Sequence, residues 1–296
     1  MNAVTPNVRI DCVVESRDRL GETPLWCDRT QKLWWIDIEN PALRSYDPAS
    51  GAQETVALPG TYAGTQALTK AGDRLLAEDL TLYSRDADTG YPCDLLTLEH
   101  GLDNRLNDGR VDARGRFWVG TMDNGLSQPN GSLYRVDTDG VATRVETGVV
   151  VSNGIAFSPD GGTLYFTDTR RYTSFAYDLD LDDGVIANRR VFADYSASGD
   201  RPDGACVDAD GCLWAAFFAG GRIVRYRPDG RIDRTIAMPV TNPTCLAFGG
   251  RDLKTLYVTT AWKFLSPEQL AEEPQAGGLF AIEGVGQGLP EHRFGA

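Results

Sequence analysis

The sequence repeats a short apolar and aromatic pattern six times. Each copy follows a turn that contains Gly, Asp or Lys, and most copies end on a small or acidic residue. The copies begin at Leu33, Leu75, Phe117, Leu164, Leu213 and Leu256. They recur every 42 to 49 residues, which is the spacing expected for the four-stranded blades of a β-propeller.

The residues between the copies also favour β-structure. Turns such as Pro228-Asp229-Gly230 lie between alternating apolar residues, as in β-hairpins, because Gly accepts a positive φ. Helical periodicity is almost absent, apart from one or two turns expected over 267–273. This disfavours barrels and doubly wound sheets, which need long helices between strands. A β-sandwich would not require six evenly spaced copies, so we predict an all-β, six-bladed propeller with four-stranded blades.

The ends of the sequence predict how the ring closes. The last repeat provides only three strand-like runs, one short of a full blade, and the apolar run at residues 8–14 precedes the first repeat. Pairing this run with the C-terminal strand would remove two open sheet edges. We therefore expect one propeller domain over residues 1–296, with a closing strand at 8–14 and a tail at 286–296.

Charge and composition exclude several classes of function. Asp and Glu number 42 against 29 Lys and Arg, for a net charge of −13, which argues against binding nucleic acid or an anionic membrane. We see no signal peptide and no apolar run long enough to span a bilayer. The six cysteines show no metal-binding spacing and are expected to be reduced. A cytoplasmic monomer is the expectation, since no long apolar surface run suggests an interface.

Aligning the repeats identifies candidate site residues. A further apolar strand precedes each aromatic strand, and in a propeller these first strands line the central channel. One position near the start of each forms a ring around the axis. Its six residues are Glu22, Gly64, Asn107, Asn153, Asp203 and Thr244.

Four of the six ring residues carry oxygen ligands. Asn153 and Asp203 each precede Gly, so each alone is also consistent with an ordinary turn. Two carboxylates close together in a channel, however, require a cation or a raised pKa. An all-oxygen set suits Ca²⁺, Mg²⁺ or Mn²⁺, whereas Zn²⁺ or Fe²⁺ is less favoured without His or Cys.

Other catalytic chemistries have little support in the sequence. The two histidines, His100 and His292, lie outside the repeat-equivalent positions, which disfavours a Ser-His-Asp or Cys-His site. No glycine-rich loop opens a helix, as a phosphate-binding loop would. Asp123 follows a channel strand, and we interpret it either as a substrate contact at the rim or as an ordinary loop residue.

Several segments resemble one known family, the SMP-30/gluconolactonase family, also called regucalcin-like. The resemblance covers about residues 15 to 285. The segments are 21–26 (GETPLW), 105–109 (RLNDG), 120–122 (GTM), 152–154 (SNG), 201–204 (RPDG) and 248–250 (FGG). As a set they resemble bacterial sugar-acid pathway lactonases more than the animal calcium-linked members.

The resemblance implies a six-bladed propeller that holds one divalent cation and, in many members, hydrolyses sugar lactones. It implies metal ligation by Glu22, Asn153 and Asp203, with Arg105 and Asn107 facing the substrate. One departure is Thr23, where the family usually has Gly.

These residues suggest a mechanism for a sugar lactonase, a hydrolase of carboxylic ester bonds. Asp203 is the candidate general base, because a carboxylate can accept a proton from water. Arg105 is placed to stabilise developing negative charge on the lactone oxygens. Two alternatives remain open. One is another metal-dependent esterase or phosphotriesterase, and the other is a non-catalytic calcium-binding propeller.

Overall fold

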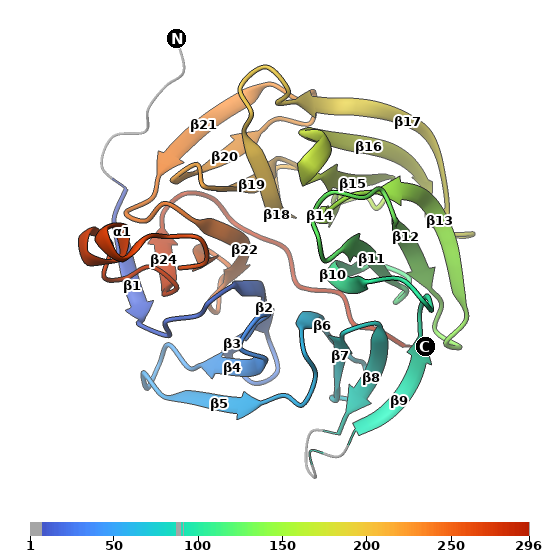
Figure 1. The fold of residues 1–296 in the computed structure, drawn as a ribbon, viewed down its shortest axis with the longest axis horizontal. Coiled ribbons are helices and arrows are strands. Elements are labelled where there is room, and N and C mark those ends of the chain that lie inside the picture. The colour runs from blue at the N-terminus through green and yellow to red at the C-terminus, as the bar shows by residue number, and fades with distance from the viewer. Residues whose placement is uncertain (1–7, 87–89, 91, 296) are drawn as a thin grey trace.

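The computed structural model describes residues 8–86, 90 and 92–295. Over these residues the strands form six antiparallel sheets of four strands each. The sheets are arranged as blades around a common axis (Figure 1). The prediction of an all-β, six-bladed propeller is confirmed.

The first three blades follow one another in chain order. Blade 1 contains β2 (Gly21–Cys27), β3 (Lys32–Asp37), β4 (Ala42–Tyr46) and β5 (Gln53–Ala57). Blade 2 contains β6 (Ala63–Leu68), β7 (Arg74–Glu78), β8 (Thr81–Arg85) and β9 (Pro92–Thr97). Blade 3 contains β10 (Asn104–Val111), β11 (Phe117–Asp123), β12 (Gly131–Val136) and β13 (Ala142–Val149).

The remaining three blades complete the ring. Blade 4 contains β14 (Ser152–Phe157), β15 (Thr163–Asp168), β16 (Thr173–Asp180) and β17 (Val185–Asp194). Blade 5 contains β18 (Arg201–Val207), β19 (Leu213–Phe218), β20 (Arg222–Tyr226) and β21 (Ile232–Ala237). Blade 6 contains β22 (Pro243–Gly249), β23 (Thr255–Thr260), β24 (Leu279–Glu283) and β1 (Ile10–Val14).

Burial decreases from the axis outward within a blade. Every residue of β2 is buried, whereas most of β5 is exposed. The repeated aromatic pattern corresponds to the second strand of each blade, from β3 to β23. Its side chains pack between neighbouring blades. One such cluster joins Leu75 and Leu82 of blade 2 to Phe117 and Val119 of blade 3.

The ring closes as the sequence predicted. The N-terminal strand β1 pairs antiparallel with β24, and Ile10 lies opposite Ile282. Figure 1 shows β1 beside β24, at the outer edge of the last blade. The helix expected over 267–273 is α1 (Pro267–Glu272), in the connection from β23 to β24. No helix among the described residues is both long and apolar enough to cross a bilayer.

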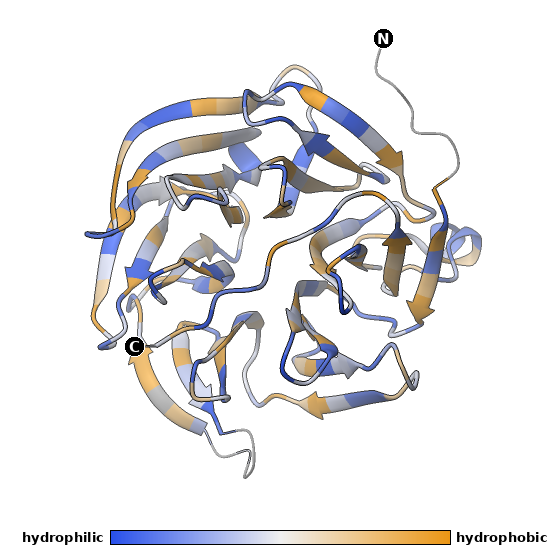
Figure 2. Cartoon of the chain, turned by 180° about the vertical axis from the view of Figure 1, so that it is seen from behind, coloured by the Kyte–Doolittle hydropathy of each residue, from blue (hydrophilic) through white to orange (hydrophobic). Residues whose placement is uncertain are grey.

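The C-terminal segment crosses the centre of the ring on the face opposite α1 (Figure 2). The amide of Phe294 donates to the carbonyl oxygen of Leu68 at 2.8 Å, and the amide of Lys70 donates to the carbonyl oxygen of Phe294 at 2.9 Å. Arg110 on β10 forms an ion pair of 3.4 Å with Glu291. The segment therefore links blades 2 and 3 to blade 6 and covers that end of the channel.

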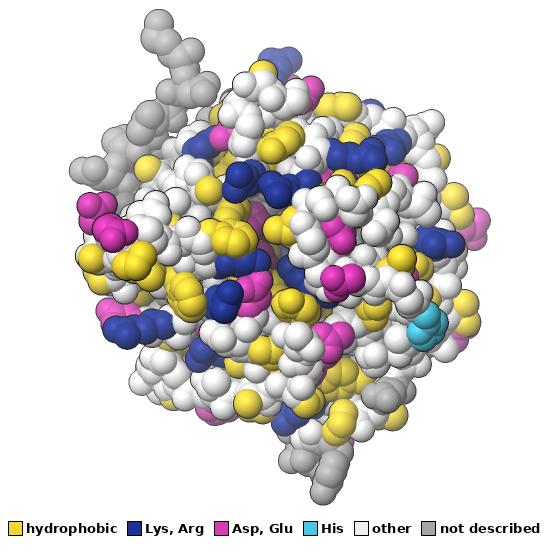
Figure 3. Space-filling view, in the orientation of Figure 1, with side chains coloured by type: hydrophobic (Ala, Val, Ile, Leu, Met, Phe, Trp, Pro, Cys, Tyr) yellow, Lys and Arg dark blue, Asp and Glu magenta, His cyan; other side chains and the backbone are white. Residues whose placement is uncertain are grey.

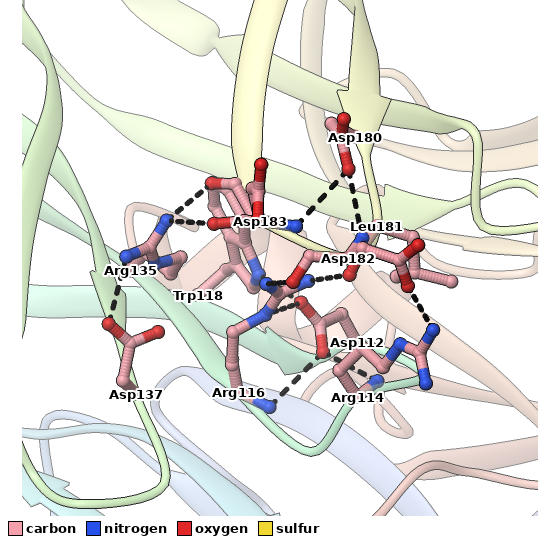
Figure 4. Close-up of polar contacts among 11 residues, drawn as sticks. Asp112, Arg114, Arg116, Trp118, Arg135, Asp137, Asp180, Leu181, Asp182 and Asp183 are labelled. Atoms are coloured by element: carbon pink, nitrogen blue, oxygen red, sulfur yellow. Dashed lines mark hydrogen bonds and ion pairs between the residues drawn. The ribbon is translucent and has the colours of Figure 1, made fainter.

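Polar contacts join blade 3 to blade 4 (Figure 4). The buried carboxylate of Asp112 accepts hydrogen bonds from Arg116 Nε at 2.7 Å and from Trp118 Nε1 at 2.8 Å. Arg116 in turn donates to the carbonyl oxygen of Leu181 at 2.7 Å, in the turn between β16 and β17. Asp112 therefore orients the arginine that contacts the next blade.

Candidate functional site

Each innermost strand contains a β-bulge at the level of the predicted ring. These strands are β2, β6, β10, β14, β18 and β22, and they contact one another around the channel. The register shifts fall at 22–25, 63–65, 106–109, 153–156, 202–205 and 243–245. Because a bulge redirects side chains and interrupts pairing, four of the six bulges place a polar ring residue in the lining of the channel. At the other two, Gly64 has no side chain and the hydroxyl of Thr244 donates to the carbonyl oxygen of Gly21.

The bulges bring most of the predicted site residues to one cavity. The cavity measures about 450 Å³, a size suited to a small molecule. Its lining includes all three predicted metal ligands, Glu22, Asn153 and Asp203, together with Arg105 and Asn107. Figure 3 shows acidic side chains within a central hollow and Lys and Arg side chains around it.

A chain of hydrogen bonds connects Arg105 to the amide side chains of the site. Arg105 donates to Asn107 Oδ1, and Asn107 Nδ2 donates to Asn153 Oδ1 at 2.9 Å. Asn153 Nδ2 donates to the hydroxyl of Thr169 at 2.9 Å, and that hydroxyl donates to the carbonyl oxygen of Pro202 at 2.6 Å. These contacts run from blade 3 through blade 4 to the residue before Asp203.

Three buried carboxylates lie around the channel. Burial and the charge of Asp108 raise the pKa of Glu22 to about 8. Burial and the charge of Glu22 raise the pKa of Asp203 well above its usual value. Burial also raises the pKa of Asp108, whose Oδ2 accepts a hydrogen bond from the amide of Ile155 at 2.7 Å. Without a cation the site therefore favours protonated carboxyl groups.

The donor set fits a divalent cation. Glu22 Oε2 accepts a hydrogen bond from the amide of Thr23 at 2.9 Å. Asp203 is only 7% exposed, and its carboxylate accepts no hydrogen bond from any residue that the structure describes. A buried carboxylate without donors is costly unless a cation compensates it. The described residues contain no cluster of three His, Cys, Asp or Glu suited to a metal, so this site depends on the amide oxygen of Asn153.

Asp123 is the one candidate that does not line the cavity. It is the last residue of β11, and its Oδ2 accepts hydrogen bonds from the amides of Ser127 and Gln128, both at 2.9 Å. These bonds lower its pKa and organise the turn that follows. The described residues that line the cavity include neither His100 nor His292.

Sequence reasoning missed three charged residues that line the cavity: Arg170, Arg201 and Lys263. Arg201 lies two residues before Asp203, so its place in that motif was the available signal. Arg170 and Lys263 belong to connections that follow β15 and β23. Their approach to the channel depends on how these connections fold over it, which no local pattern shows.

Comparison with known proteins identifies the family. Residues 20–262 match the SMP-30/Gluconolactonase/LRE-like region. The chain belongs to this family. The resemblance seen in the channel motifs is therefore confirmed.

Members and solved structures of the family match over nearly the full length. The chain is 40% identical to a 6-deoxy-6-sulfogluconolactonase of Pseudomonas putida, over 97% of the chain and 99% of the relative. It is 37% identical to an L-arabinolactonase of Azospirillum brasilense, over 99% of the chain and 98% of the relative. The crystal structure of a calcium-binding protein, regucalcin, from Agrobacterium tumefaciens matches at a TM-score of 0.91 and 33% identity. The match covers 97% of this chain and 98% of the regucalcin chain.

Proposed function

We propose that this chain hydrolyses a sugar lactone, with Glu22, Asn153 and Asp203 holding one divalent cation. The observation that carries the proposal is the pair of buried carboxylates, Glu22 and Asp203, which face one cavity from different blades beside Arg105. The all-oxygen donors favour Ca²⁺, Mg²⁺ or Mn²⁺. The relatives named as lactonases support an aldonolactone as the substrate.

In this proposal each of three residues has a separate role in ester hydrolysis. Asp203 accepts the proton of the attacking water, since its carboxylate has no other hydrogen-bond donor among the described residues, and returns it to the ring oxygen when the C–O bond of the lactone breaks. Arg105 donates to the lactone oxygens as negative charge develops there. Asn107 holds Arg105 and Asn153 in place, and its Oδ1 keeps one acceptor position for a substrate hydroxyl, since both N–H groups of its amide are used within the protein. A bound divalent cation supplies Lewis-acid polarisation of the carbonyl.

The test is hydrolysis of a panel of aldonolactones, followed with a pH indicator. We expect chelation to abolish turnover and added cation to restore it. Asp203→Ala should lower kcat by at least about 100-fold, as removal of a general base does. Asp200→Asn is the matched control, because Asp200 pairs with Arg222 outside the cavity. Half of the wild-type rate in Asp203→Ala with added cation would refute this mechanism.

Two alternatives make different predictions in the same assay. A metal-dependent esterase or phosphotriesterase would turn over aryl esters or organophosphates faster than lactones. A non-catalytic calcium-binding propeller would bind the cation but hydrolyse none of these compounds. The Agrobacterium regucalcin is a calcium-binding protein, so direct measurement of Ca²⁺ affinity belongs in the panel.

A further inference from the structure

Two arginines at the mouth of the cavity have no carboxylate partner among the described residues. Arg170 lies in the short 3-10 helix after β15, and Arg201 is the first residue of β18. Both line the cavity and are partly exposed, whereas Arg105 is only 5% exposed deeper in the channel. Nε of Arg170 donates to the carbonyl oxygen of Leu126 at 3.0 Å, which leaves its two terminal amino groups available.

The basic residues beside these two arginines are already neutralised. Arg222 forms a 2.6 Å ion pair with Asp200, the acidic residue next to Arg201. Lys263 pairs with Glu39, and Arg171 lies 3.4 Å from Asp168. Arg170 and Arg201 therefore present uncompensated positive charge in a protein of net charge −13.

The two arginines are linked to the candidate metal ligands. Arg170 directly follows Thr169, whose hydroxyl accepts from Asn153 and donates to the carbonyl oxygen of Pro202. Arg201 directly precedes Pro202, and Asp203 follows it. Arg170 and Arg201 are thus each one residue away from the hydrogen bond between Thr169 and Pro202, which joins blades 4 and 5 beside the site.

We propose that Arg170 and Arg201 bind an anionic substituent of the substrate, at the end remote from the lactone ester. The inference rests on the proposed function and narrows its substrate class to lactones that carry a phosphate, sulfonate or carboxylate. A planar guanidinium with several donors matches the oxygens of these groups, whereas a neutral hydroxyl needs only one donor. Local positive charge also offsets the repulsion that an acidic protein exerts on an anion.

The experiment compares four forms of glucono-δ-lactone that differ only at C6, which carries a hydroxyl, phosphate or sulfonate group or is itself oxidised to a carboxylate. We expect kcat/KM to be at least about tenfold higher for one or more charged forms than for the neutral form, as charge-assisted hydrogen bonds provide. Arg170→Gln and Arg201→Gln should each remove most of this preference, because kcat/KM falls further for the charged form than for the neutral lactone. The substituent that shows the preference identifies the anion.

Arg171→Gln is the matched control, because it removes the same charge next to Arg170 but outside the cavity lining. The Arg171→Gln variant should retain the preference for the charged lactone over the neutral one. A wild-type preference for the neutral lactone, or equal losses on both substrates, would overturn the inference. Thermal melting of each variant verifies that it is folded.

A binding measurement separates this inference from the proposed function. Calorimetry with gluconate and with its three analogues that carry a phosphate, a sulfonate or a carboxylate at the C6 end needs no turnover. If no lactone is hydrolysed, the proposed function fails. At least about tenfold tighter binding of one of the charged acids than of gluconate, lost when both arginines are replaced by Gln, would still support the anion site. Equal affinities for gluconate and all three charged acids would overturn it.

Discussion

Glu22 and Asp203 show how single residues acquire their chemistry from the fold. Each is under 10% exposed, and they belong to blades 1 and 5. Burial is the largest cause of the raised pKa of both groups. Both shifts favour the protonated carboxyl group until a cation replaces the proton.

Cation binding should therefore be coupled to proton release. Because the pKa of Glu22 is raised to about 8, Glu22 holds a proton at pH 7, and a divalent cation must displace it. We expect apparent affinity to rise as the pH approaches 8. Calorimetric titration in buffers of different ionisation enthalpy measures the released protons. Glu22→Gln is the control, and a binding heat independent of buffer in the wild type would contradict the prediction.

Thr23 shows a second effect of the bulge in β2. Its φ is 45°, a left-handed conformation that glycine adopts at little cost and a β-branched residue does not. Such a conformation favours glycine over threonine at this position. We expect Thr23→Gly to raise the free energy of unfolding by about 1 kcal/mol. Chemical denaturation measures the change, and a decrease in stability would count against strain at this position.

At the scale of elements, buried aspartates hold the hairpins of the blades and their neighbours together. Asp112 accepts from Trp118 and Arg116 in blade 3, and Asp208 accepts from Trp214 and Arg225 in blade 5 at 2.8 Å each. In both blades the aspartate follows the innermost strand, and the tryptophan lies on the second strand. The pair therefore ties the two strands nearest the channel.

Removing one such aspartate should destabilise the fold. Asp112→Ala leaves Trp118 Nε1 and the Arg116 guanidinium buried without their partner, at a cost of about 3–5 kcal/mol. Asp137→Ala is the matched control, because Asp137 pairs with Arg135 at 2.8 Å but is 28% exposed (Figure 4). That change should cost less than about 1 kcal/mol. Similar unfolding free energies for the two variants would show that the buried network contributes little.

At the scale of the whole molecule, the ring depends on contacts between the two ends of the sequence. Strand β1 completes blade 6, and Val14 packs with Trp35 and Leu279 between blades 6 and 1. The C-terminal segment covers the far end of the channel. The candidate site therefore faces solvent on the α1 side of the ring.

Deleting residues 1–14 should lower the melting temperature sharply. The deletion exposes one edge of β24 and opens the contact between the first and last blades. Deletion of residues 1–7 is the control, since it leaves β1 in place. Thermal denaturation followed by circular dichroism measures both. An unchanged melting temperature in the longer deletion would show that β1 is dispensable for closure.

The number of blades, the second strand of each blade and the level of the ring could be predicted from the sequence alone. They depend on a local pattern of apolar residues and turns, and every repeat contains this pattern. The same register also selected Glu22, Asn107, Asn153 and Asp203, because equivalent positions in equivalent strands must face one axis.

Only the tertiary structure decided which side chains share the cavity. The carboxylate of Asp123 accepts hydrogen bonds from backbone amides in the turn that follows it. Arg170 and Lys263, by contrast, reach the mouth of the cavity from connections in different blades. Such placements depend on contacts between residues far apart in the chain and on bulges that redirect individual side chains. The repeat therefore determined the scaffold and the level of the site, and the folding of loops over the channel decided the charge at its mouth.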